Sequence, residues 1–144
     1  MATVFDVAKY FLEKLGPMST WKLQKLCYYA QAWSLVWDEK PLFQEDFEAW
    51  SNGPVCPQLF QRHKGLFTIN NQQLSTGNPN SFDKDQVETL EAICRDYGDK
   101  DPYWLREQTH YEDPWKNARG DLPVGQPSEA IIAKDAMGEY YGSL

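Results

Sequence analysis

The chain has little of what metal, cofactor and disulfide sites need. Its 144 residues include only two histidines, His63 and His110, and three cysteines, Cys27, Cys56 and Cys94. A zinc site built from protein side chains needs about three or four convergent ligands, and the wide spacing of these residues predicts none. An odd number of dispersed cysteines also argues against a disulfide framework. We therefore expect no metal, no cofactor and a reduced, cytoplasmic environment.

Recognisable catalytic motifs are absent as well. The sequence has no Gly-rich phosphate loop, no His-Glu-x-x-His and no Gly-x-Ser-x-Gly elbow. His110-Tyr-Glu112 has the His-x-Glu spacing of zinc deaminases, but the Pro-Cys-x-x-Cys that accompanies it there is missing. We expect His110 to hydrogen-bond a neighbouring loop, and the pairs Glu45-Asp46 and Glu112-Asp113 to be helix-start or surface charges. No catalytic residue is identified, and the chain is not expected to be an enzyme.

Basic clusters and long apolar runs are also missing. Lys and Arg number 14 against 21 Asp and Glu, so the formal net charge is −7. Nucleic-acid binding needs a basic footprint, so no direct nucleic-acid contact is expected and a DNA-binding autorepressor is disfavoured. An acidic protein suits a basic protein partner, although the same charge also serves solubility. No run reaches membrane-spanning length and no signal peptide is evident, so we expect no membrane contact.

Aromatic residues, by contrast, are abundant. Six Trp, eight Tyr and seven Phe make up 15% of the chain, within a hydrophobic total of 42%. This composition predicts a heavily packed core, sticky surface anchors, or both. The length suits one domain over residues 1–144 with a core of its own.

The stretch from Ser19 to Asp38 is the most distinctive segment. Ser19 or Thr20 can cap a helix, and no Gly or Pro interrupts the run until Pro41. A first apolar stripe comprises Leu23, Leu26, Cys27, Ala30, Trp33, Ser34 and Trp37. A second comprises Trp21, Tyr28, Ala32 and Leu35, and a polar line comprises Gln24, Gln31 and Asp38. A helix that is apolar on two sides is buried or sandwiched, so this one should be the central helix of the domain.

Caps and stops predict further helices on either side of it. One runs over 4–15, the next from Val55 or Pro57 to Lys64, and the next from a cap at Ser81 or Asp83 to Tyr97. The others span 102–110, 113–119 and 127–141, the last with Ile131, Ile132, Ala136 and Tyr140 inward. Residues 66–80 are polar and predict a loop with a short extended piece at 67–69. Between Pro41 and Val55 the pattern fits a short strand or a hairpin arm, turned at Asn52-Gly53-Pro54. We expect an all-α fold, a compact helical domain around a central buried helix, with a minor β-hairpin there.

Several blocks of the sequence occur in a specific order. They are Lys22-Leu-Gln-Lys-Leu-Cys-Tyr-Tyr-Ala-Gln31, Pro41-Leu-Phe43, Phe47-Glu-Ala-Trp-Ser-Asn-Gly-Pro-Val55 with Pro57, and Thr109-His110 with Pro114-Trp115. Together they resemble the Panacea-domain family, which includes SocA-like antitoxins and phage-associated proteins of the GepA type. The resemblance covers nearly the whole chain and departs locally at Asp99–Tyr103. The family positions that we expect to be mainly structural are Leu23, Gln24, Lys25, Leu26, Tyr29, Ala30, Gln31, Glu48, Trp50, Gly53, Pro54, His110, Pro114 and Trp115.

The resemblance implies an antitoxin of a toxin–antitoxin pair. Such proteins are mostly helical, are encoded beside a toxin, often on phages or prophages, and commonly neutralise it by forming a complex. Some of their toxins block translation. One branch instead acts as an adaptor that delivers the toxin to a Clp-type protease. A small enzyme acting on toxin, nucleotide or peptide is the alternative from another functional class.

The second apolar stripe is the expected toxin-binding site. If the domain packs on the first stripe, Trp21, Tyr28 and Leu35 are left partly exposed beside Lys25, and exposed aromatics with a charged rim are typical of binding hot spots. The alternative is that C-terminal helices cover this stripe. The toxin would then bind the polar loop 66–80 or the aromatics between Tyr103 and Trp115.

Overall fold

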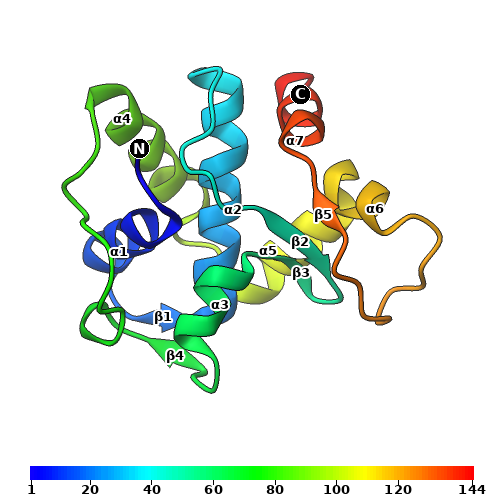
Figure 1. Cartoon of the computed structure of the whole chain (residues 1–144), viewed down its shortest axis with the longest axis horizontal. Helices are drawn as coiled ribbons and strands as arrows, with labels where there is room; N and C mark the ends of the chain where they lie inside the picture. The colour runs from blue at the N-terminus through cyan, green and yellow to red at the C-terminus, as the bar shows by residue number, and fades with distance from the viewer.

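The computed structural model describes residues 1–144 and places helix α2, Thr20–Trp37, at its centre. Figure 1 shows α2 running through the middle of the molecule, with α1 and α4 on one side and α7 with the β2–β3 hairpin on the other. The Ser19 side chain caps α2 by accepting a hydrogen bond from the Lys22 amide at 3.1 Å. Every residue from Leu23 to Ala32 is buried, which confirms the expected central helix.

Six further α-helices surround or adjoin α2. Three of them begin at strong start signals: α1 at Thr3 and α4 at Asp83 have full capping boxes, and α5 begins with Pro in its first turn. Their bounds are α1 Val4–Leu15, α3 Pro57–His63, α4 Lys84–Tyr97, α5 Pro102–Tyr111, α6 Asp113–Arg119 and α7 Lys134–Gly142, with a 3₁₀ turn η1 at Asn71–Gln73.

Five short strands form two small antiparallel sheets. β1, Met18–Ser19, pairs with β4, Thr68–Ile69, in the otherwise irregular segment after α3. β2, Phe47–Trp50, and β3, Gly53–Val55, form the expected hairpin, and β5, Ile131–Ile132, adds to the free edge of β2. The fold is therefore mainly helical with a minor hairpin, as predicted.

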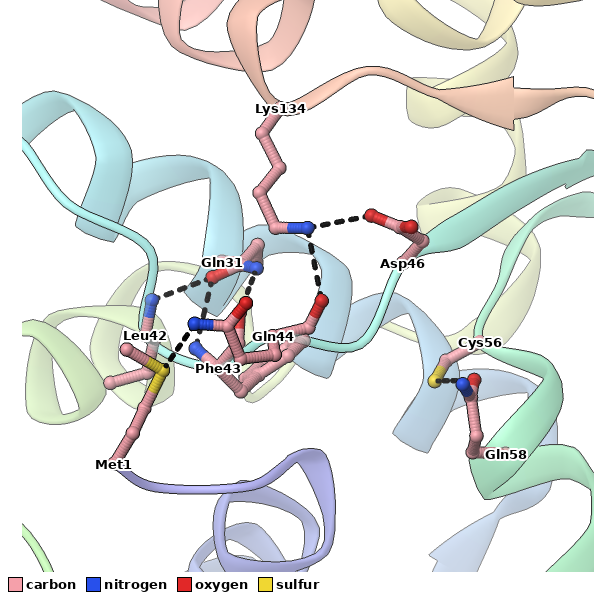
Figure 2. Close-up of polar contacts among 9 residues, drawn as sticks. All are labelled: Met1, Gln31, Leu42, Phe43, Gln44, Asp46, Cys56, Gln58 and Lys134. Carbon is pink, nitrogen blue, oxygen red and sulfur yellow. Dashed lines mark hydrogen bonds and ion pairs between the residues drawn. The ribbon is translucent and has the colours of Figure 1, made fainter.

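The two glutamines of the polar line, Gln24 and Gln31, are buried and hold two loops onto α2, whereas Asp38 is half-buried at the end of the helix. Gln31 is 1% exposed; its Oε1 accepts from the Leu42 amide at 2.7 Å and its Nε2 donates to the Phe43 carbonyl at 2.8 Å (Figure 2). One heptad earlier, Gln24 makes the same pair of bonds with the backbone of Cys56, at 2.8 and 3.2 Å. A buried amide is tolerated because both of its polar atoms are bonded.

The C-terminal region differs from the prediction of one helix over 127–141. Its first part is extended, because the Ala49 amide bonds the Ala130 carbonyl at 2.8 Å and draws Ile131–Ile132 onto the edge of β2. Helix α7 starts only at Lys134, whose Nζ contacts Asp46 Oδ1 at 2.6 Å and the Gln44 carbonyl at 3.0 Å (Figure 2). Its inward residues are Met137 and Tyr141, whereas Ile131 and Ala136 are exposed.

None of the helices combines the length and the apolar character that crossing a membrane would require.

Candidate partner-binding surface

The resembling blocks meet where the β2–β3 hairpin contacts α2, α5 and α6. The Trp115 indole of α6 donates to the Trp50 carbonyl at 2.8 Å, and the Trp50 indole donates to Glu48 Oε1 at 2.8 Å. The His110 ring stacks on Trp115 with centroids 3.8 Å apart and planes 7° from parallel. The bond from Trp115 to Trp50 joins residues 65 positions apart. We call this region the hairpin junction.

Gly53 in the hairpin turn leaves room for Lys25 of α2. Its φ of +120° is a conformation that L side chains rarely adopt. A Cβ atom there would lie 2.5 Å from Lys25 Cε and 3.1 Å from Thr109 Oγ1. Gly53 is therefore required both by the backbone and by the close approach of Lys25.

Lys25 is buried without a partner. It is 1% exposed, and its Nζ makes no hydrogen bond. The ammonium lies 5.4 Å from the centroid of the Trp21 ring. Burial, with a smaller contribution from the Arg106 charge, lowers the pKa of Lys25 from 10.5 to about 7.

His110 has a similar environment. Its Nε2 is buried and unbonded, so the expected hydrogen bond to a neighbouring loop is replaced by the stacking on Trp115. Burial, followed by the charges of Arg106 and Lys25, lowers the pKa of His110 to about 4. The ring is thus held neutral beside two cationic side chains.

Glu112 is also a buried ionisable group near the junction, and it is fully bonded. It precedes α6, as expected of a helix-start acid, but its side chain does not cap the helix and the residue is only 4% exposed. Its Oε1 accepts from the hydroxyls of Tyr29 at 2.8 Å and Tyr141 at 2.7 Å, and its Oε2 accepts from Gln108 Nε2 at 3.0 Å. The carboxylate therefore joins α2, α5 and α7 from the inside.

The second apolar stripe of α2 is mostly covered. Tyr28 and Lys25 are each 1% exposed, so the expected exposure of these two residues is wrong. Tyr28 packs edge-on against Tyr141 of α7, and half-buried Leu35 lies beside Gly138 of the same helix. The alternative expectation, that a C-terminal helix covers the stripe, is the one that the structure shows. Trp21, at 41%, is the exposed member.

Two neighbouring cavities share the Trp21 side chain as a wall. One, of about 130 Å³, lies toward Trp50, Phe60 and Leu66; the other, of about 190 Å³, lies toward Tyr103. Tyr103 is 68% exposed and Leu66 is 37% exposed. We call Trp21, Trp50, Phe60, Leu66 and Tyr103 the Trp21 surface. They come from α2, β2, α3, the segment after α3, and α5, respectively.

The charge of this surface is opposite to that of the whole chain. The residues that line its two cavities include Lys25, Lys64 and Arg106 and no Asp or Glu. The cavity between α1 and α4 contains Glu13 and Glu91, and the one beside the start of α7 contains several acids with two lysines. The Trp21 surface is therefore a locally cationic, aromatic region of an acidic protein.

Sequence reasoning found part of this surface. It singled out Trp21 and Lys25, and it gave the region between Tyr103 and Trp115 as an alternative site. It also gave the polar loop that begins at Leu66 as an alternative site. It missed Arg106 and Asn52, which join Trp21 only through the fold. Nowhere does the structure gather three or more His, Cys, Asp or Glu side chains in a way that could hold a metal ion.

Comparison with known proteins identifies the family. The family model described as "Antitoxin SocA-like, Panacea domain" matches residues 23–116. The chain belongs to this family. Antitoxin SocA of Caulobacter vibrioides is 41% identical over 59 residues, and the match covers 38% of this chain and 31% of that protein. The matched segment thus spans about a third of that relative's length, and no solved structure matches the chain.

Within this Panacea domain, the family positions separate into three groups. Leu23, Leu26, Tyr29 and Ala30 lie in the core, and Gln24 and Gln31 fasten loops to α2. The remaining positions meet at the hairpin junction: Lys25, Glu48, Trp50, Gly53, Pro54, His110, Pro114 and Trp115. The matched segment contains the whole Trp21 surface except Trp21 itself, which lies two residues before it.

Proposed function

We propose that this chain is an antitoxin that neutralises a protein toxin by binding it directly through the Trp21 surface. Family membership supports the antitoxin role, and one observation supports the place of binding: exposed aromatic side chains surround two adjoining cavities beside the hairpin junction. We propose that the antitoxin binds its toxin in the cytoplasm, where toxins that block translation act.

The surface has the composition of a binding hot spot. Trp and Tyr supply large contact areas at little cost in side-chain entropy, and cavities beside them accept the anchors of a partner. Trp21 and Tyr103 project from α2 and α5, which are fixed by the core beneath them, so little conformational freedom is lost on binding. A toxin segment with apolar anchors and an acidic rim would complement it.

Neutralisation in this way requires no catalysis by the antitoxin. Binding that covers or distorts the active site of the toxin suffices, and its extent follows from the affinity and the amount of antitoxin present. We therefore propose a stoichiometric inhibitor and not an enzyme.

Co-expression with the adjacent gene product tests this function. The wild-type chain should restore growth and should co-purify with the toxin, while Trp21→Ala should lose both properties without unfolding. Restored growth without a complex, or with a chemically altered toxin, would contradict direct binding. The same assay in a host that lacks Clp-type proteases separates the adaptor mechanism, because only an adaptor would lose rescue there.

A further inference from the structure

The larger cavity of the Trp21 surface contains an unusual set of side chains. It is lined by Trp21, Lys25, Asn52, Pro102, Tyr103 and Arg106, and its volume is about 190 Å³. Cofactor and drug-sized ligands occupy pockets of roughly 300–1,000 Å³, so this one suits a single small group.

Two cations face this space with unused hydrogen-bonding capacity. Lys25 is 1% exposed and its Nζ has no partner. Arg106 uses its Nε on Asn52 Oδ1 at 3.2 Å and has Nη1 3.5 Å from Glu107 Oε1, which leaves Nη2 unbonded. A buried donor without an acceptor costs free energy, so an acceptor that enters the cavity would relieve that cost.

The first turn of α5 adds to the positive character of the cavity. Pro102 and Tyr103 belong to this turn, where the helix dipole is positive. The nearby Asp101 carboxylate is already used as the N-cap, accepting from the Trp104 amide at 2.7 Å. No Asp or Glu lines the cavity, in contrast to the cavities beside α1 and α7.

We propose that this cavity is a binding site for one oxyanion group, a phosphate or a carboxylate, held by Lys25 Nζ and the Arg106 guanidinium. The group enters between Trp21 and Tyr103. The Trp21 ring now covers the ammonium, and no hydrogen bond fixes its indole, so the ring can swing outward to admit the group. Arg106 supplies the planar fork that matches phosphate and carboxylate oxygens, and Lys25 supplies a point charge.

The proposal does not depend on the antitoxin role, because it is tested on the free protein. Bound anion favours the charged form of Lys25, so the Lys25 pKa, lowered to about 7 in the empty cavity, should rise. Titration with inorganic phosphate at pH 7, followed by NMR of ¹³C-labelled lysine, should move the Lys25 Cε resonance in a saturable way. Sodium acetate should do the same more weakly, and chloride at equal ionic strength should not.

Three variants make the test specific. Lys25→Met keeps roughly the length of the side chain and removes the charge, and Arg106→Gln removes the second cation. Each substitution should weaken phosphate binding by about tenfold or more, because charge-assisted hydrogen bonds to the phosphate are lost. Lys84→Met, on a side chain that is 88% exposed, removes one positive charge elsewhere and should bind as the wild type does. Phosphate binding by Lys25→Met is followed by the Trp21 indole resonance, which also reports whether that variant is folded.

The outcomes decide the proposal and the source of the anion. No saturable response of the wild type, or an equal response of Lys25→Met and Arg106→Gln, overturns it. A positive response is then extended to the purified toxin: if toxin binding excludes phosphate, the natural oxyanion is an acidic side chain of the toxin. If both bind together, the natural anion is a free phosphate compound. A failure of toxin binding with intact phosphate binding would overturn the proposed function alone.

Discussion

Glu112 and Lys25 are both ionisable side chains buried within the same set of helices, but they differ in their hydrogen bonds and in their access to the surface. Glu112 accepts three hydrogen bonds, from Tyr29, Tyr141 and Gln108, and so joins three helices. Lys25 makes none, and it lies against Gly53 and beside a cavity that opens at the surface. One buried charge is bonded on all sides by the fold, and the other is left with unused donors.

This difference distinguishes a structural charge from one available for binding. A buried charge is tolerated when its hydrogen bonds are complete, and removing it then leaves its partners unsatisfied. A buried charge without partners destabilises the fold, so its presence beside a cavity favours a role in ligand binding.

The largest effect is expected at Glu112. Glu112→Ala leaves the buried Tyr29 hydroxyl without its acceptor and leaves Tyr141 only its longer bond to the Tyr28 hydroxyl at 3.2 Å. It also opens a small cavity, so the free energy of unfolding should fall by about 3–5 kcal/mol. Urea denaturation measures this change. Glu107→Ala, on a side chain that is 49% exposed, should change it by less than about 0.5 kcal/mol. Equal effects of the two substitutions would show that the Glu112 network does not support the fold.

A smaller loss is expected at Gly53, which faces Lys25. Gly53→Ala combines an unfavourable positive φ with a Cβ placed 2.5 Å from Lys25 Cε, and should cost about 2–3 kcal/mol. Gly125→Ala is the matched control, because its φ is +99° but nothing lies within 4 Å of the added Cβ. It should cost about 1 kcal/mol, from the backbone alone. If both variants lose the same stability in thermal unfolding, the close packing of Lys25 under the hairpin is not significant.

Lys25 should behave in the opposite way to Glu112, and the effect should depend on pH. Its pKa is lowered to about 7 in the fold, so below pH 7 the folded protein carries a buried charge that the unfolded chain solvates freely. Lys25→Met should therefore be more stable than the wild type by about 1–3 kcal/mol at pH 6. This advantage should shrink as pH rises from 7 toward 10.5, where Lys25 is neutral in both states. Destabilisation by this substitution at pH 6 would mean that the ammonium is bonded in solution.

The sequence predicted the features that depend on residues close together in the chain, such as helix caps and hairpin turns. Ser19, Thr3 and Asp83 are caps that act within one turn, and the Asn52-Gly53-Pro54 turn closes a hairpin of adjacent strands. Central α2 followed from apolar residues on two of its sides. The expected inward direction of Trp37 was wrong: this last residue of α2 is 47% exposed, and its ring stacks on that of Trp33.

What the sequence could not predict depends on distant contacts. Ile131–Ile132 fits a helix or a strand equally well, and only the free edge of β2 decides between them. The sequence marks Gln24 and Gln31 only as polar positions of the helix. Each is buried because backbone groups distant in the chain, 32 residues from Gln24 and 11 from Gln31, hydrogen-bond both polar atoms of its amide. In the site, Trp21 and Lys25 were visible, but the cavity that they share with Arg106 exists only once α5 packs against α2.

Binding of purified toxin to matched tyrosine variants tests the account most directly. Tyr103 and Tyr111 lie in α5 and are 68% and 76% exposed, but only Tyr103 belongs to the Trp21 surface. Both Tyr→Ala variants should leave the free energy of unfolding within about 0.5 kcal/mol of the wild type. In isothermal titration calorimetry, Tyr103→Ala should weaken toxin binding by about 1–3 kcal/mol while Tyr111→Ala binds as the wild type does. Full-strength binding by Tyr103→Ala and Trp21→Ala would contradict the account and place the toxin on another face of the molecule.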